Sequence, residues 1–167
     1  TSLIGHVLAS SGCELQVGGN LGPPVLSLAS LSRDGIYVLE LSSYQLDLCD
    51  RARFDICVLL NISPDHLDRH GDLDGYVAAK HRQFRDRPEG SQIAVVGVDD
   101  EHGRSLAADL EGRTGWRVVQ ISVRRRLTDG VSVINGRLFD GASAKAIGDL
   151  RPMETLLGAH NWQNAAA

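Results

Sequence analysis

The sequence has little cysteine, little proline and no excess of positive charge, and each shortage argues against a class of protein. Five prolines in 167 residues, with 43% hydrophobic and 23% charged residues, are typical of a globular protein rather than a disordered or fibrous one. Acidic residues outnumber basic ones by 21 to 17, which argues against a nucleic-acid partner, because clustered Lys and Arg bind phosphate backbones. The dense basic run Arg124-Arg125-Arg126 is short and is expected to be a solvated loop.

The cysteines and the apolar runs indicate the compartment. Cys13, Cys49 and Cys57 are odd in number and contain no Cys-x-x-Cys pair, which favours free thiols in a reducing compartment over a disulfide framework. The longest apolar run, Ile56 to Leu60, is far shorter than the roughly 20 residues of a membrane-spanning helix. We therefore expect a cytoplasmic, monomeric protein of one domain with no membrane segment.

The chain alternates strand-type and helix-type segments. Apolar residues at helical spacing predict a helix over 1–11 that ends before Gly12, and the run 55–62 is apolar without alternation, as in a strand covered on both faces. Asn135-Gly136 between two short β-type runs predicts a hairpin with a type I′ turn. This alternation predicts an α/β fold with a doubly wound, mostly parallel sheet. The other expected strands are 14–17, 36–41, 93–96 and 117–122, and the other expected helices are 73–87, 100–111 and 159–167.

Polar residues at the ends of the predicted strands are candidate site residues, because open α/β sheets bind ligands at the carboxyl ends of their strands. The glycines of residues 18–22 (GGNLG) would let backbone amides approach a phosphate or a sugar, and a plain turn is the alternative. Glu40 lies at the end of an apolar strand, where burying an unpaired carboxylate is costly. A bound metal ion would relieve that cost, and a salt bridge is the alternative.

The densest set of polar side chains lies in residues 61–71, directly after the most apolar strand, and contains two histidines, an arginine and acidic residues. His66 and His70, four residues apart, fit a pair of metal ligands on one helix face. The glutamate that a zinc protease places beside its first histidine is absent. On these residues alone, a metal-dependent hydrolase, another metal or phosphate site, and a capped, hydrogen-bonded loop all remain open.

Lys80 and two amides of the last predicted helix complete the candidates. Lys80 lies among Tyr76 and Ala79, and partial burial would favour its neutral amine, which reacts with carbon dioxide to give a metal-binding carbamate. A surface lysine is the alternative. Asn161 and Asn164 lie three residues apart on one helix face and would read an adenine edge, and helix capping is the alternative.

The order and spacing of these segments together resemble the Mur ligase family. The segment in which Glu40-Leu41 is followed by Ser-Ser-Tyr-Gln-Leu is similar to the members that add D-glutamate to UDP-N-acetylmuramoyl-L-alanine in peptidoglycan synthesis. The resemblance implies an ATP-dependent amide ligase, with another Mur-type ligase or a non-catalytic nucleotide- or substrate-binding module as alternatives. The segments that look like signatures of the family's central ATPase domain are GGNLG at 18–22, LELSSYQLD at 39–47, LLNISPDHLDRHGDLDGYVAAK at 59–80 and GAHNWQN at 158–164.

The resemblance also implies roles for individual residues. In the family, ATP phosphorylates the carboxylate of the muramoyl substrate, and the incoming amine attacks the acyl phosphate. Glu40 would bind one Mg²⁺, and His66 with carbamylated Lys80 would bind a second, so that two cations offset the charge of the transferred phosphoryl group. His66 and Lys80 are thus the expected catalytic residues. The expected contacts are Gly19, Asn20 and Ser42 with the muramoyl substrate, and Asn161 and Asn164 with ATP.

The resemblance further predicts what these 167 residues leave out. The family's phosphate-binding loop, which ends in Gly-Lys-Ser/Thr, would lie just before Thr1, and the domains for uridine and D-glutamate would lie outside the chain. We therefore expect residues 1–167 to be part of a central domain that does not ligate by itself. In this arrangement His70 would not bind metal, whereas Asp65 and Asp68 would orient His66.

Overall fold

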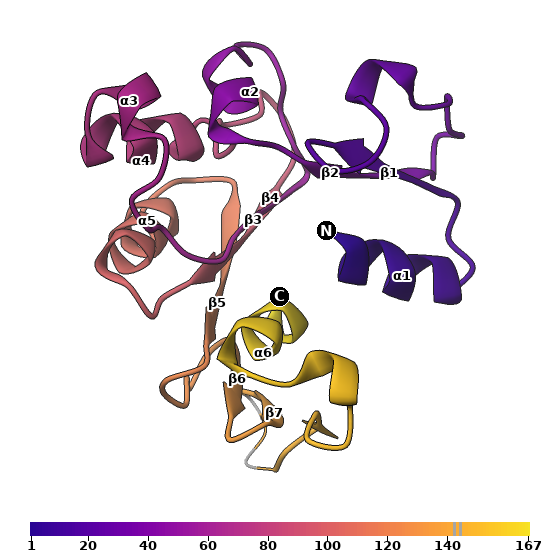
Figure 1. The fold of residues 1–167 in the computed structure, drawn as a ribbon, viewed down its shortest axis with the longest axis vertical. Coiled ribbons are helices and arrows are strands. Elements are labelled where there is room, and N and C mark those ends of the chain that lie inside the picture. The colour runs from indigo at the N-terminus through magenta and orange to yellow at the C-terminus, as the bar shows by residue number, and fades with distance from the viewer. Residues whose placement is uncertain (142, 144) are drawn as a thin grey trace. The chain divides into compact units, whose positions relative to one another are not determined.

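The computed structural model describes residues 1–141, 143 and 145–167, and Figure 1 shows it as a ribbon coloured from indigo at the N-terminus to yellow at the C-terminus. The chain forms two compact units, Thr1–Asp50 and Arg51–Ala167, here named unit 1 and unit 2. Among the described residues, no helix combines the length and the apolar character that a membrane crossing needs.

Unit 1 contains two parallel strands, β1 (Leu15–Gly19) and β2 (Ile36–Glu40), which pair along their whole length. Helix α1 (Ser2–Ser10) precedes them and ends, as predicted, before Gly12, whose φ of +79° is left-handed. The parallel pairing places the carboxyl ends of both strands at one edge. The short elements of the unit are the 3₁₀ helix η1 (Val25–Ser27) and helix α2 (Ser43–Asp47).

The described part of unit 2 forms a six-stranded sheet in the order β3-β4-β5-β6-β7-β8. Strands β3 to β6 are parallel, and β7 pairs antiparallel with both β6 and β8. The prediction of an α/β fold with a mostly parallel sheet is therefore confirmed. The strands are β3 (Ile56–Leu59), β4 (Gln92–Gly97), β5 (Trp116–Ser122), β6 (Val131–Ile134), β7 (Arg137–Asp140) and β8 (Gly148–Asp149), and the helices are α3 (Leu67–His70), α4 (Leu73–His81), α5 (Glu101–Glu111), the 3₁₀ helix η2 (Glu154–Leu156) and α6 (Ala159–Ala166).

Successive residues of the parallel strands of unit 2 point to opposite faces of the sheet and build a core on each. Ala94 and Val96 of β4 pack in one cluster with Leu110 of α5. Val95, between them, belongs to a second cluster with Ala166 of α6. Helices therefore cover both faces of the sheet, as a doubly wound arrangement requires, and Figure 1 shows α5 and α6 on different sides of β5.

The predicted hairpin is confirmed, but one predicted helix is too long. Asn135 and Gly136 join β6 to β7 with φ of +50° and +75°, as a type I′ turn requires. The helix predicted over 73–87 ends at His81. In the last predicted turn, the side chain of the buried Gln92 accepts from the Arg87 N–H at 2.7 Å and donates to the Arg85 carbonyl at 3.0 Å. Residues 85–87 thus give backbone bonds to Gln92 instead of continuing the helix.

Candidate functional site

The predicted site residues lie at the carboxyl ends of strands or on the elements that follow them. In unit 1 they end or follow β1 and β2, and in unit 2 they follow β3 and lie on α4 and α6. Within each unit this is where open α/β sheets bind ligands, at the carboxyl ends of their strands. The residues are Gly19, Asn20, Glu40 and Ser42 in unit 1, and His66, Lys80, Asn161 and Asn164 in unit 2.

A backbone bond brings Asn20 and Glu40 together in unit 1. The Asn20 N–H donates to the Glu40 carbonyl oxygen at 2.7 Å, just past the last strand pair, Gly19 and Glu40. Gly19 has a φ of +112°, and a Cβ at this position would collide with the Glu40 carbonyl. Glycine is therefore required at position 19 by the fold itself. Its expected contact with a substrate stays a prediction.

Ser42 begins α2 as one half of a capping box. Its N–H donates to Gln45 Oε1 at 2.9 Å, and its Oγ accepts the Gln45 N–H at 3.3 Å. A hydroxyl that accepts one bond keeps its own hydrogen for a further partner. The cap thus fixes the position of a hydroxyl donor two residues beyond Glu40.

His66 precedes α3 in a left-handed backbone conformation, with φ of 51° and ψ of 35°. For a residue other than glycine this conformation costs on the order of 1–2 kcal/mol, and such strained positions cluster at functional sites. Asp65 contributes to the local order, because its Oδ1 accepts the His66 N–H at 2.9 Å and its Oδ2 lies 3.4 Å from His66 Nε2. The His66 side chain is 47% exposed, so a ligand can reach it from solvent.

Tyr76 connects Lys80 with the surroundings of His66 in unit 2. Lys80 is half-buried, and its Nζ lies 5.8 Å from the centroid of the Tyr76 ring. Burial raises the pKa of Tyr76, and the negative charge of Asp65 raises it further. On α3, His70 packs its ring 5.7 Å from that of Tyr76. Lys80 and the residues around His66 thus share Tyr76 as a neighbour.

The side chains around His66 give an incomplete metal site on their own. Among the described residues, no group of three or more His, Cys, Asp and Glu side chains is arranged to hold a metal ion. Asp65 and His66 supply one oxygen and one nitrogen donor, and Mg²⁺ prefers oxygen. A carbamate on Lys80 would add oxygen donors that an unmodified lysine lacks. The donor set therefore fits Mg²⁺ if Lys80 is modified or if further oxygen ligands are supplied.

The sequence-based prediction does not include Asp99 and Asp100, which follow β4 after one intervening residue, Val98. The Ser122 hydroxyl at the end of β5 donates to Asp99 Oδ1 at 2.5 Å. Asp100 caps α5 through the Gly103 N–H at 2.8 Å, and its other oxygen accepts the Ile62 N–H, beyond β3, at 3.2 Å. The two carboxylates thus join the ends of three neighbouring strands. The rule that selects polar residues after apolar strands would have found both.

Helix α6 begins after Gly158, whose φ is +93°. Asn161 and Asn164 are both half-buried on this helix. The Asn161 amide donates to the Leu157 carbonyl at 3.0 Å, which leaves its side-chain oxygen for other bonds. Gln163, between the two asparagines, is also absent from the predicted residues, and it is buried and bonded to the end of β3.

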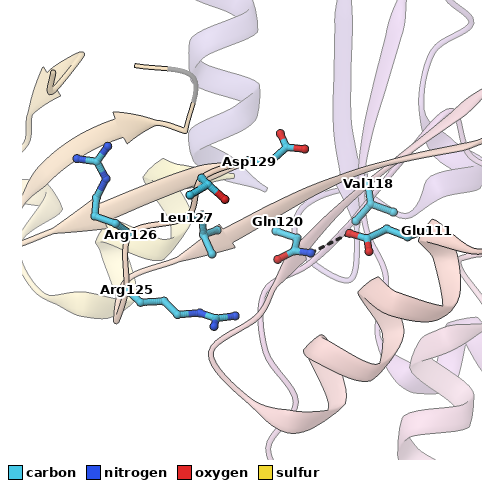
Figure 2. A pocket seen from close by; sticks show the side chains of 8 residues that line it. Glu111, Val118, Gln120, Arg125, Arg126, Leu127 and Asp129 are labelled. Atoms are coloured by element: carbon cyan, nitrogen blue, oxygen red, sulfur yellow. Dashed lines mark hydrogen bonds between the residues drawn. The ribbon is translucent and has the colours of Figure 1, made fainter. Parts of the chain in front are cut away.

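The pocket in Figure 2 lies in another part of unit 2, and none of the predicted site residues lines it. It has a volume of about 320 Å³ and is bounded by α5, β5 and residues 125–129. In it, the Gln120 amide donates to Glu111 Oε1 at 2.8 Å. Residues 124–126 are exposed, as predicted for a solvated loop, and the Arg126 guanidinium lies 3.7 Å from the centroid of the Phe139 ring.

The chain is similar to proteins of one family along its whole length. The family profile described as Mur ligase middle domain matches residues 2–167. Proteins named UDP-N-acetylmuramoylalanine--D-glutamate ligase from Rhodospirillum rubrum and Paramagnetospirillum magneticum are each 49% identical to this chain, over 169 and 167 residues. A protein of the same name from Phenylobacterium zucineum is 44% identical over 169 residues. Each comparison covers 100% of this chain but only 35% or 36% of the relative, so the chain spans about a third of their length.

Proposed function

We propose, because the chain belongs to the Mur ligase family, that it forms the central part of an enzyme that joins D-glutamate to UDP-N-acetylmuramoyl-L-alanine with the use of ATP. The observation that carries the proposal is similarity over the full chain to relatives named for this ligation. The segments with Glu40, His66 and Lys80 all lie inside the matched region. A role in peptidoglycan synthesis, in the cytoplasm and as a monomer, is part of the proposal.

Mur ligases use ATP and Mg²⁺, and the proposed reaction has two steps. The terminal carboxylate of the muramoyl substrate takes the γ-phosphoryl group of ATP, and ADP leaves. The amine of D-glutamate then displaces phosphate from the acyl phosphate, so that an amide forms and the amine loses its proton. Mg²⁺, when bound, would supply positive charge against the phosphate oxygens. The residues of this chain would hold the cations and orient the reactants.

We assign the cation ligands to three residues. Glu40, at the end of β2, would hold one Mg²⁺, and His66, oriented by Asp65, would hold the other together with carbamylated Lys80. Lys80 is half-buried, with its Nζ 5.8 Å from the centroid of the Tyr76 ring, so it is not the fully solvated surface lysine of the alternative. The neutral amine would bond to the carbon of carbon dioxide and lose a proton, which gives the carbamate.

The remaining assignments concern the two larger substrates. Gly19, Asn20 and Ser42 would contact the muramoyl substrate, and the capped Ser42 hydroxyl would act as a donor. Asn161 and Asn164 would contact ATP from α6. We place the phosphate-binding loop and the domains for uridine and D-glutamate outside residues 1–167, in keeping with relatives of which the chain covers 35%.

The test is phosphate release by the full-length protein with ATP, UDP-N-acetylmuramoyl-L-alanine and D-glutamate. Lys80→Ala should lower the D-glutamate-dependent rate about a hundredfold or more, because it removes a proposed metal ligand. Lys145→Ala is the matched control, since Lys145 is the other lysine of the sequence and is exposed. That control should stay within about twofold of the unmodified rate, as surface substitutions do.

Three further measurements distinguish the proposed ligase from the alternative functions. Removing dissolved carbon dioxide should slow the unmodified protein and leave Lys80→Ala unchanged, which a purely structural lysine would not explain. Phosphate release with another amino acid in place of D-glutamate would indicate a different Mur-type ligase. ATP binding without phosphate release would indicate a non-catalytic module.

A further inference from the structure

A buried glutamine attaches helix α6 to the end of strand β3. Gln163 is 7% exposed, and its Nε2 donates to the Leu60 carbonyl oxygen at 2.7 Å. Its Oε1 accepts from Asn61 Nδ2 at 3.1 Å. Because a carbonyl oxygen only accepts, the bond to Leu60 fixes which end of the Gln163 amide carries the hydrogens. These three residues form what we name the amide clamp.

Gly97, the last residue of β4, leaves the space that the amide clamp needs. A Cβ at this position would lie 2.9 Å from Gln163 Nε2 and would collide with the Leu60 carbonyl oxygen. Any larger residue would therefore displace one of the two partners. The absence of a side chain at the end of β4 thus leaves room for the Gln163 side chain beside β3.

The amide clamp adds directional hydrogen bonds to the apolar packing that attaches α6 to the sheet. Trp162, Ala165 and Ala166 of α6 pack in the core cluster that includes Val95 and Ile121. Such packing is not directional. The two amide bonds require good alignment of donor and acceptor, and so permit one rotation of the helix about its axis. Gln163 therefore fixes α6 more sharply than the packing does.

We propose that Gln163 is a positioning residue for nucleotide binding, an inference that rests on the proposed function. Asn161 and Asn164 share one face of α6, whereas Gln163 points to another, because each residue turns the helix by about 100°. On the other side of the amide clamp, Leu60 and Asn61 are the first residues of the loop that leads to His66. The amide clamp would thus fix the positions of the Asn161 and Asn164 amides, the proposed ATP contacts, relative to the loop with His66, the proposed metal ligand.

The experiment replaces Gln163 by methionine, which keeps the length of the side chain and removes both bonds. In the full-length protein, Gln163→Met should raise the KM for ATP, and the Kd for ATP measured by calorimetry without D-glutamate, about tenfold. The KM for the muramoyl substrate should stay within about twofold, because the amide clamp acts on the nucleotide side. Asn61→Ala removes one of the two bonds and should raise both ATP constants about threefold.

A matched control is available in the same unit. Gln120→Met removes the one side-chain hydrogen bond from Gln120 to Glu111 in the pocket of Figure 2. It should leave the KM and the Kd for ATP unchanged. An equal rise in Gln120→Met would mean general destabilisation and would overturn the proposal. Unchanged ATP constants in Gln163→Met would also overturn it, and if that variant does not fold, Asn61→Ala decides in the same way. A protein without D-glutamate-dependent phosphate release, whose Kd for ATP still rises in Gln163→Met, would contradict the proposed function and support the positioning role.

Discussion

In unit 2 the predicted site residues are attached to a sheet with a core on each face, whereas in unit 1 they are attached to two strands with very little core. Among residues 1–50, all of which are described, Leu46 is the one large apolar side chain that is fully buried. Leu26 and Leu48 are 100% and 78% exposed. The position of Glu40 therefore depends mainly on backbone bonds, while that of Gln163 and its neighbours also depends on packing.

Because of this difference, we expect the two units to unfold locally at different free energies. Elements with few buried apolar contacts unfold locally more readily than core strands do. We expect β1 and β2 to open before β4 and β5. Three measurements test whether the two units differ in this way.

The largest contrast should be in thiol reactivity. Cys13 of unit 1 is half-buried, while Cys57 of β3 is 3% exposed, and burial, with a smaller contribution from Asp55, raises the pKa of its thiol from 9.0 to about 12. At pH 8 the thiolate of Cys57 is therefore about a thousandfold scarcer than for an ordinary thiol, and the thiolate is the reactive form. Mass spectrometry after brief alkylation should find Cys13 labelled and Cys57 unlabelled.

The raised pKa of the Cys57 thiol also makes the free energy of unfolding depend on pH. The folded state holds the thiol proton more tightly than the unfolded state, so the stabilising contribution is complete below about pH 9 and is lost as the pH rises towards 12.

In urea the two cysteines should react at similar rates. Equal labelling of Cys13 and Cys57 in the folded protein would contradict the comparison.

The second contrast is in the cost of truncating a leucine. Leu110 of α5 is 0% exposed in the core of unit 2, and Leu110→Ala should lower the free energy of unfolding by about 2–5 kcal/mol. Leu26→Ala in unit 1 removes a fully exposed side chain and should change it by less than about 0.5 kcal/mol. Both tryptophans of the sequence, Trp116 and Trp162, lie in unit 2, so their fluorescence in a denaturant titration measures Leu110→Ala, and hydrogen exchange of the unit 1 amides measures Leu26→Ala. If Leu110→Ala lowers the free energy of unfolding as little as Leu26→Ala does, the buried core is not what makes unit 2 more stable than unit 1.

Local signals in the sequence predict most of the fold. Asn135-Gly136 predicts the hairpin because a two-residue turn with positive φ depends on those two residues alone. The uninterrupted apolar run around β3 predicts a strand covered on both faces. The end of α4 is missed because the side chain of Gln92, on the following strand β4, bonds to the backbone of Arg85 and Arg87, and helical periodicity does not report such a contact. Pro88 alone indicated a later end.

The candidate site is predictable only where its signal is local. Glu40 and His66 are found because they end or follow apolar strands. Gln163 is missed because its partners lie about a hundred residues earlier, at Leu60 and Asn61, and no spacing rule reports such a contact. The left-handed backbone of His66 also has no local sequence signal, since a glycine would be the usual residue there.

The smallest contrast compares two glycines of unit 1. Gly12 and Gly19 both have positive φ, but a Cβ at Gly12 would meet nothing within 4 Å, whereas at Gly19 it would collide with the Glu40 carbonyl. Gly12→Ala should cost only the left-handed conformation, on the order of 1 kcal/mol, and Gly19→Ala should cost about 1–3 kcal/mol because it also breaks the approach of the two strands. Hydrogen exchange of the Asn20 amide, which bonds to Glu40, should therefore speed up in Gly19→Ala and not in Gly12→Ala. If both substitutions affect that amide equally, the close approach of Gly19 to Glu40 is not what holds this part of unit 1.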